Sequence, residues 1–394
     1  MRRVYLDNAA TTRVKEKVVE SMLPYFTDIY GNPSSVHSIG RDAKRVIDTE
    51  RAKIAEILGA KPREIFFTAS GSEADNWAIK GVAAANRKKG NHIITTSIEH
   101  HAVLHTCQYL ERQGFEVTYL PVDSYGKVSI EDVEKAVRKD TILISIMHAN
   151  NEIGTIQPIA EIGELAKSKG IPFHTDAVQT TGTIPVNVKD LNVDMLSLSA
   201  HKFHGPKGIG VLYARNGRIG DNLIHGGAQE ANKRAGTENI PYIVGMSTAL
   251  QLAVENMEEN RKKVQMLRDD IISFVLNNID HVRLNGHPTD RLPGNANFSF
   301  NYIEGESLLL MLDMKGICAS SGSACTSGSL DPSHVLLAIG LSHEVAHGSV
   351  RFSLSDENTQ EDVDYLKEAL PGIVKTLRNI SPLYNGRKEG NNHV

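Results

Sequence analysis

The sequence predicts an α/β protein with a large, doubly wound, mostly parallel sheet and a smaller α+β domain. The chain has 394 residues, of which 40% are hydrophobic and 23% charged, which is ordinary for a soluble globular protein with a sizeable core. Strand-like and helix-like segments alternate over about 200 residues, as in doubly wound sheets. Near residue 260 the composition shifts, and we place a domain boundary there.

The first predicted element is a long amphipathic helix that begins at Ser38. Its apolar side chains recur at i, i+3 and i+4 spacing, at Ala43, Val46, Ile47, Ile54, Ile57 and Leu58. Gly59 ends the helix, because glycine readily adopts the left-handed conformation of a helix C-terminus.

Short runs rich in β-branched or aromatic residues follow this helix, and most are separated by helical stretches. These predicted strands lie at residues 64–68, 92–97, 116–120, 141–147, 171–176, 194–200 and 210–214. Parallel strands need crossover connections, which are usually helices, so the alternation favours a mostly parallel sheet. Ligands of such sheets bind at the carboxyl ends of the strands, where we look for functional residues.

The smaller domain follows a helical stretch near residues 241–278. Three further runs, at residues 296–301, 316–322 and 349–355, are predicted to be strands of a separate sheet.

Composition also limits the partners. Lys and Arg number 43 against 47 Asp and Glu, so the net charge of -4 favours neither nucleic acid nor a membrane surface. No apolar run approaches the roughly 18 residues that span a bilayer, and the N-terminal stretch is too polar for a signal peptide. Three cysteines fit neither a disulfide framework nor a zinc site. We therefore expect a cytoplasmic protein with a small-molecule or protein partner.

A small-residue turn follows the first predicted strand. Ser70, Gly71 and Ser72 precede a helical stretch, and such a turn offers backbone N–H groups, hydroxyls and a helix dipole that suit a phosphate. The alternative is a simple N-cap, with Ser72 as the cap and Glu73 in the first turn.

Two charged residues lie at later strand ends. Asp176 ends a very apolar strand, and its carboxylate needs a partner such as a protonated pyridine nitrogen or an arginine. Lys202 follows another strand beside Ser199, His201 and His204, where neighbouring cations favour the neutral amine of a Schiff base, although a surface lysine is the simpler interpretation. Phosphate turn, acidic strand end and lysine occur in an order that accommodates pyridoxal phosphate.

Histidines follow the second predicted strand. His100 is placed to stack on a planar cofactor or to move protons. His101 and His105 stand four residues apart on the following helix, but without a third ligand or an HExxH arrangement they do not predict a metal site.

The three cysteines differ in their surroundings. Cys107 and Cys318 lie among apolar residues, which indicates packing roles. Cys325 lies in a segment of Ser, Gly, Ala and Thr and is a candidate nucleophile, with a flexible linker as the alternative.

Taken in order, these motifs resemble the pyridoxal-phosphate-dependent cysteine desulfurases of the nitrogen-fixation and iron-sulfur-cluster type, within the class V aminotransferase family. The matching stretches are YLDNAATT, GNPSSVHSIG, FTASGSEADN, IEHHAVL, NNEIGTIQPI, HTDAVQ, SAHKFHGPKGIG, RAGTEN, SSGSACTSGS and VRFSLS. The resemblance implies the fold type I architecture of pyridoxal-phosphate transferases. The domains would be residues 15–260, which bind the cofactor, and residues 1–14 with 261–394, which carry a cysteine loop at about 320–333.

The resemblance also implies roles for the cofactor residues. Lys202 would bear the cofactor as a Schiff base, Asp176 would pair with its pyridine nitrogen, Gln179 would reach its phenolic oxygen and His100 would stack on its ring. The implied phosphate ligands are Gly71, Ser72, Ser199, His201 and, from the second subunit of a homodimer, Thr237.

Further implied roles concern the substrate. Asn151 and Arg351 would hold the carboxylate of L-cysteine, with Asn151 also near the cofactor, and Cys325 would form the persulfide. The products would be L-alanine and sulfur for an iron-sulfur scaffold protein or another acceptor. Another enzyme of the same fold, an aminotransferase or a selenocysteine/cysteine lyase, is the alternative. One departure is GSEADN, where relatives usually have an Ala-Thr-Glu pattern.

Overall fold

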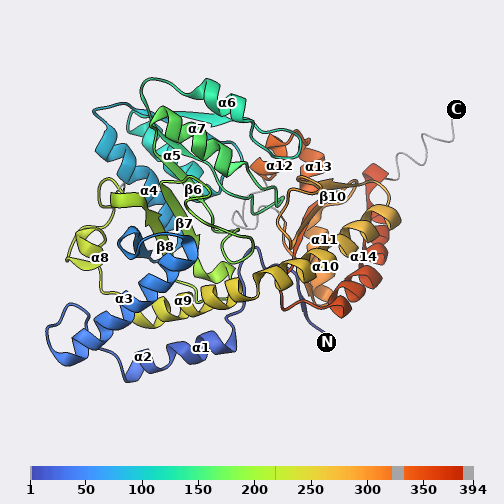
Figure 1. Cartoon of the computed structure of the whole chain (residues 1–394). Helices are drawn as coiled ribbons and strands as arrows, with labels where there is room; N and C mark the ends of the chain where they lie inside the picture. Colours follow the sequence, from blue (N-terminus) through green and yellow to red (C-terminus); the bar gives the residue numbers. More distant parts are fainter. Residues whose placement is uncertain (1, 218, 322–331, 385–394) are drawn as a thin grey trace.

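A seven-stranded sheet forms the larger part of the molecule, which is described by a computed structural model over residues 2–217, 219–321 and 332–384 (Figure 1). The strand order is β2-β8-β7-β6-β5-β3-β4. The strands are β2 Ile65–Thr68, β3 His92–Thr96, β4 Glu116–Leu120, β5 Thr141–Ser145, β6 Phe173–Asp176, β7 Met195–Ser199 and β8 Gly210–Ala214. All pairs are parallel except those of β8, which runs antiparallel to β2 and β7. The predicted strands and the mostly parallel sheet are confirmed.

Helices cover both faces of this sheet, as a doubly wound fold requires. The helices of this larger part are α1 Glu16–Met22, α2 Pro24–Thr27, α3 Ser38–Leu58, α4 Gly71–Asn86, α5 His101–Arg112, α6 Ile130–Ala136, α7 Ile159–Lys169, α8 Gln229–Asn232 and α9 Ile240–Glu255. Successive strand residues serve opposite cores: Ile65 and Phe67 pack with α3 and α9, whereas Phe66 packs with α4 and α5. Helix α3 ends as predicted, since Gly59 has a φ of 70° and its N–H bonds back to Ala55.

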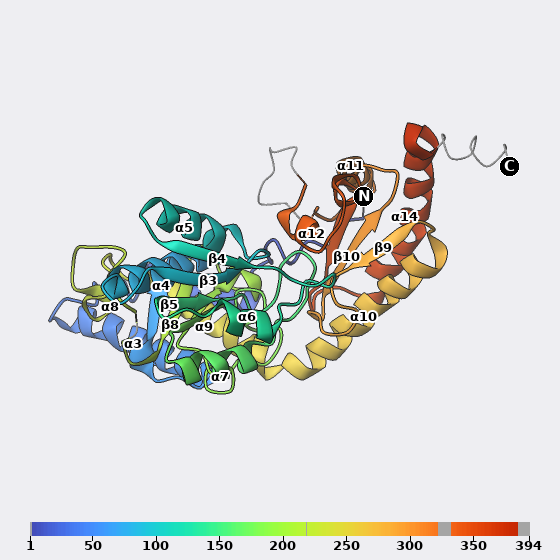
Figure 2. The ribbon, with the colours of Figure 1, turned by 90° about the horizontal axis from the view of Figure 1, so that it is seen from above.

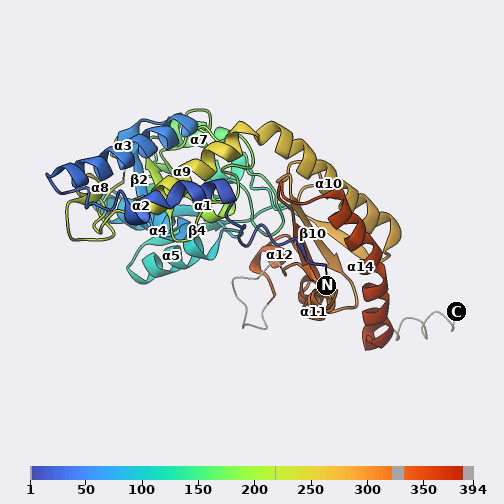
Figure 3. The same ribbon diagram turned by 90° about the horizontal axis from the view of Figure 1, so that it is seen from below.

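The smaller part has a three-stranded antiparallel sheet in the order β12-β10-β9. Its strands are β9 Val282–Asn285, β10 Asn295–Phe300 and β12 Ser349–Ser353, and its helices are α10 Met257–Asn278, α11 Gly305–Met314, α12 His334–Ala338, α13 His343–His347 and α14 Gln360–Ile380. Figures 2 and 3 show α10 running from the large sheet to the small one.

The structure refines two predictions about this part. The run at residues 316–322 is divided, because β11 Ile317–Cys318 pairs in parallel with β1 Val4–Tyr5, whereas Ser320 forms a single antiparallel bridge with Arg351 of β12. The helical stretch near 241–278 is confirmed and consists of two helices, α9 and α10, which meet at Asn256.

The hydrophobic cores follow the two sheets. The core around β10 and β12 includes Val4 and Leu6 together with residues from Val264 to Leu377, so the N-terminus packs with the C-terminal part. The boundary near residue 260 stays a prediction. Among the described residues, no helix is long and apolar enough to cross a membrane.

Candidate active site

One pocket collects ten of the twelve residues to which the family resemblance assigns a role. It lies at the carboxyl ends of β5, β6 and β7 and has a volume of about 870 Å³ when the solvent-filled space at its mouth is included. Its lining is Ala9, Ala10, Ser70, Gly71, Ser72, Asp75, His100, Met147, Ala149, Asn151, Asp176, Val178, Gln179, Ser199, His201, Lys202 and Arg351. Thr237 is exposed and outside this lining, and Cys325 lies outside the described residues.

The small-residue turn forms the start of α4. Ser70, not Ser72, is the N-cap, because the Ser70 side chain accepts a hydrogen bond from the N–H of Glu73 at 3.1 Å. Ser72 therefore lies within the first turn and lines the pocket. A Cβ at Gly71 would come within 2.7 Å of Val178, so only glycine leaves the turn undisturbed. The start of a 16-residue helix with small side chains suits an anion such as phosphate.

Asp176 occupies the last position of β6 and is 6% exposed. Burial raises the pKa of Asp176 to about 6, although the N–H of Val178 and the nearby Lys202 favour its ionised form. The Val178 N–H lies 2.9 Å from Asp176 Oδ1. A buried carboxylate at a strand end can hold a cationic N–H of a bound ring.

Lys202 lies in a short 3-10 helix, Ala200–Lys202, directly after β7. Its Nζ donates to two backbone carbonyls of the N-terminal segment, Ala9 O at 2.5 Å and Ala10 O at 2.8 Å. Gln179 Nε2 donates to the same Ala9 oxygen at 3.0 Å. Residues from the N-terminus thus form the wall of the pocket that faces the lysine amine.

His100 is the N-cap of α5, and its Nδ1 accepts a hydrogen bond from the Ala102 N–H at 3.1 Å. Burial, and next the charge of Lys202, lower the pKa of His100 to about 4. The ring is therefore neutral at pH 7, with its proton on Nε2 because Nδ1 accepts. This state suits stacking and hydrogen-bond donation better than proton abstraction.

Arg351 on β12 brings the smaller part into the pocket. Its side chain is 2% exposed, Nη1 donates to Asn151 O at 2.9 Å, and Nη2 donates to Asp7 Oδ1 at 2.9 Å. Its Nε is buried and has no hydrogen-bond partner among the described residues. A buried N–H without an acceptor is costly, so a carboxylate that reaches this guanidinium would satisfy it.

A buried polar network beneath the pocket escaped the sequence analysis. Asp75 on α4 is 1% exposed and lines the pocket, and burial together with the charge of Asp176 raises its pKa well above the usual value. Ser197 hydrogen-bonds Asp75 and lies 2.9 Å from His174 Nε2. Asp75 Oδ1 itself has no hydrogen-bond partner in the described structure. The sequence HTD in β6 was the available signal for this network. Residues two apart on a strand share a face, so His174 lies on the same face of the sheet as Asp176.

The remaining histidines and cysteines fall outside the pocket. His334 joins His101 and His105, with ring centroids 4.9 Å and 4.8 Å from His101, yet the described residues contain no group of three or more ligands able to hold a metal ion. Cys107 is fully buried, as predicted for a packing residue. Cys318 is only half-buried, because its two-residue strand lies at an edge, so its assignment to the core is wrong.

Comparisons with known proteins agree with this geometry. Residues 4–366 match the class V aminotransferase family. The chain is 61% identical over 380 residues to cysteine desulfurase IscS of Methanosarcina thermophila, covering 96% of this chain and 94% of that protein. Cysteine desulfurase IscS of Clostridium botulinum is 59% identical over 386 residues, 97% of each chain.

Solved structures show the same similarity. A NifS-like protein superposes with a TM-score of 0.90 at 43% identity, covering 95% of this chain and all 100% of that one. The structure of SspA in complex with cysteine superposes with a TM-score of 0.80 at 41% identity, covering 90% of this chain and 100% of its own.

Proposed function

The chain belongs to the class V aminotransferase family and is a cysteine desulfurase, and from this premise we propose that it transfers the sulfur of L-cysteine to Cys325 with the help of pyridoxal 5'-phosphate. The observation that carries the proposal is the convergence of the α4 turn, Asp176 and Lys202 in one pocket that Arg351 enters from the smaller part.

The residues of the pocket fit the cofactor. The start of α4 at Gly71 and Ser72, with Ser199 and His201 beside it, would hold the phosphate. Asp176 would pair with the pyridine nitrogen, Gln179 would reach the phenolic oxygen, and His100 would stack on the ring. When bound, this cofactor supplies an electron sink for the negative charge that develops at the substrate Cα.

Lys202 is the residue that moves the proton. Once the substrate amine has replaced it, Lys202 is a free amine near the substrate and takes the proton from Cα. The carbonyls of Ala9 and Ala10 then accept hydrogen bonds from the ammonium that results, as they do from Nζ in the structure. Asp176 would hold a proton at the pyridine nitrogen of the bound cofactor.

Arg351 and Asn151 orient the substrate. The guanidinium already holds two acceptors and has its Nε left for the substrate carboxylate, so binding costs little reorganisation. His100, neutral and with Nδ1 occupied, contributes a ring face and an N–H and does not act as the base.

Cys325 collects the sulfur. Its thiolate attacks the substrate sulfur, the bond between that sulfur and Cβ breaks, and the electron pair left at Cβ takes a proton to form the methyl group of L-alanine. The persulfide on Cys325 is then passed to an iron-sulfur scaffold protein or another acceptor.

A homodimer is part of this proposal, with Thr237 completing the phosphate site of the second subunit. Large apolar side chains in the segment that runs from α1 through α2 to the loop before α3 are supporting evidence, because monomers rarely expose so many together. Their exposed fractions are Val19 45%, Leu23 57%, Phe26 54%, Tyr30 66% and Val36 89%. Figure 1 shows α1 and α2 along the lower edge of the molecule.

The test is to incubate the cofactor-loaded protein with L-cysteine and a reductant and to measure L-alanine and sulfide together. We expect equal amounts of both, none from Cys325→Ala, and normal amounts from the matched control Cys318→Ala. Pyruvate and ammonia would indicate a lyase instead, and full sulfide release by Cys325→Ala would refute the role of that cysteine.

A further inference from the structure

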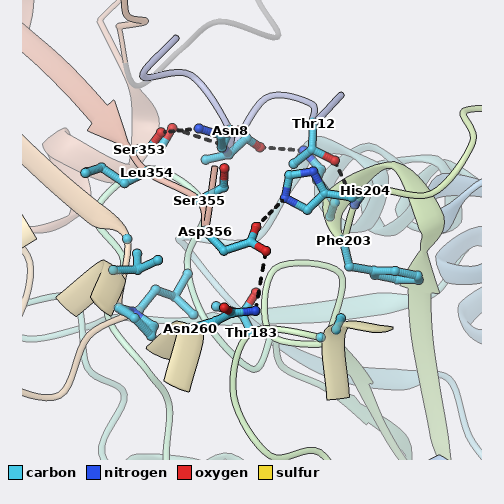
Figure 4. Close-up of a pocket in the computed structure, with 18 of the residues that line it drawn as sticks. Asn8, Thr12, Thr183, Phe203, His204, Asn260, Ser353, Leu354, Ser355 and Asp356 are labelled. Carbon is cyan, nitrogen blue, oxygen red and sulfur yellow. Dashed lines mark hydrogen bonds and ion pairs between the residues drawn. The ribbon is translucent and has the colours of Figure 1, made fainter. Parts of the chain in front are cut away.

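A second cavity adjoins the active-site pocket, and Ala9, Gln179 and Lys202 line both. Figure 4 shows Asp356 at the centre of this second cavity, directed toward His204 and Asn260. Residues 6–15 run between the large and small sheets, and we call them the N-terminal strap. The polar side chains of the second cavity hold this strap in place.

One end of the strap is fastened to the turn that carries Lys202. The N–H and hydroxyl of Thr12 donate to His201 O at 2.9 and 3.0 Å, and the His204 N–H donates to Thr12 Oγ1 at 2.8 Å. The Lys15 N–H donates to His204 O at 3.3 Å. His204 has a φ of 64°, a left-handed conformation that is uncommon for residues other than glycine, and the hydrogen bonds to the strap hold this turn.

The other end of the strap is fastened to β12. Asn8 donates through both its backbone N–H and its Nδ2 to Ser353 O, at 3.1 and 2.9 Å, and the Ala9 N–H donates to Ser353 Oγ at 2.9 Å. The carbonyls of Ala9 and Ala10 that receive the Lys202 amine therefore lie between two anchored ends.

Asp356, three residues beyond β12, closes the gap between these ends. Its Oδ1 lies 3.1 Å from His204 Nε2, and its Oδ2 accepts from Lys15 Nζ at 2.5 Å and from Asn260 Nδ2 at 3.4 Å. Burial opposes ionisation of Asp356, but the bonds from His204 and Lys15 outweigh it and hold its pKa well below the usual range.

Both ring nitrogens of His204 face acceptors. Nδ1 lies 2.9 Å from the backbone oxygen of Arg13, and Nε2 faces the carboxylate of Asp356. The carboxylate thus contacts a histidine on the Lys202 turn and a lysine on the strap, and its own loop belongs to the smaller part.

We propose that Asp356, His204 and Lys15 form a clamp that positions the carbonyls of Ala9 and Ala10 as a docking site for the protonated amine of Lys202. His204 and Asp356 are then positioning residues that act through the strap and touch neither substrate nor cofactor. The inference rests on the proposed role of Lys202 as the proton-carrying amine.

The experiment measures the reactivity of Lys202 in the cofactor-free protein. Competitive acetylation at pH 8, quantified by mass spectrometry, gives the labelling rate of Lys202 relative to the exposed Lys88. Two carbonyl acceptors favour the unreactive ammonium, so we expect Lys202 to be protected in the unchanged chain. Asp356→Asn and His204→Gln should each raise its relative rate roughly tenfold, the worth of about one hydrogen bond.

Matched variants separate the clamp from general loosening. Asp290→Asn removes an exposed pair of the same kind, with Lys127 at 2.7 Å, and should leave Lys202 protected. Lys15→Met should expose Lys202, whereas Lys15→Arg, which keeps the charge, should restore protection. The Lys15 variants test the clamp even if Asp356→Asn fails to fold. The fluorescence of Trp77, the single tryptophan of the chain, shows whether each variant is folded.

Equal protection of Lys202 in folded Asp356→Asn and His204→Gln would overturn the clamp. Borohydride reduction of the protein with pyridoxal 5'-phosphate tests the proposed function separately, since the adduct should map to Lys202. An adduct on another lysine would refute the catalytic role of Lys202. The acetylation rates would still show whether the clamp protects the Lys202 amine.

Discussion

Replacing Arg351 by lysine is the sharpest test of how the pocket selects its substrate. The change keeps the positive charge, but it removes the Nε donor that is buried without a partner and the fork that bonds Asn151 O and Asp7 at once. A hydrogen bond between charged groups contributes about 1.5–3 kcal/mol. Loss of one such bond to the substrate carboxylate predicts a KM for L-cysteine about 10- to 150-fold higher, with kcat nearly unchanged.

The assay is steady-state formation of L-alanine over a range of L-cysteine concentrations, with urea unfolding as a check on folding. Arg283→Lys is the matched control, because Arg283 lies exposed on β9 of the same sheet and its guanidinium donates to the Ser124 carbonyl at 3.1 Å. A folded Arg351→Lys variant with a KM within twofold of the unchanged enzyme would refute the carboxylate role. A fall in kcat at constant KM would place the contact in the transition state instead.

Three further predictions concern the elements that build the site. In the cofactor-free protein, burial and the charge of Asp176 raise the pKa of Asp75, so the stability that is present below the unfolded pKa of Asp75 is lost as the pH rises toward its folded pKa. The free energy of unfolding of Asp75→Asn, measured in urea, should therefore rise relative to that of the unchanged chain by up to about 1.4 kcal/mol per pH unit. Parallel stability curves for the two proteins from pH 5 to 7 would contradict this. Ser70→Ala removes the N-cap of α4 and should cost about 1 kcal/mol of stability and weaken cofactor binding measured by absorbance, whereas equal affinity would separate the cap from the phosphate site. Phe173→Ala empties a fully buried position beneath the pocket and should cost about 3–5 kcal/mol in the same unfolding assay, and a cost under about 1 kcal/mol would show that the core collapses around it.

The sequence predicted best what depends on local pattern. Asp176 and Lys202 were found because the first ends a short apolar strand and the second follows one closely, and the carboxyl edge of a parallel sheet gathers such residues. Asp75 was missed because an acidic residue in the second turn of a helix usually faces water. Only the packing of α4 across the sheet buries Asp75. The buried residues Ala74 and Ala78, which precede and follow Asp75 on the helix, indicate that this side of α4 faces the core.

Long-range pairing was the other limit. A strand-like run such as residues 316–322 carries no mark of its partner, and the β11 pairing with residues at the far N-terminus is fixed only by tertiary packing. The same holds for the strap, whose residues have no periodicity of either helix or strand. Motif resemblance marked YLDNAATT as functional, but the carbonyl contacts to Lys202 follow only from the structure.

The strap contacts both of the groups that the proposed reaction uses most. Asp7 bonds Arg351, which would receive the substrate carboxylate, and the carbonyls of Ala9 and Ala10 bond the amine of Lys202, which the substrate would displace. Asn8 lies between them and is bonded to Ser353 of the smaller part. The contacts to both groups therefore come from four consecutive residues, Asp7 to Ala10. A segment from the N-terminus, packed with the smaller part, thus forms a wall of a pocket built on the larger sheet.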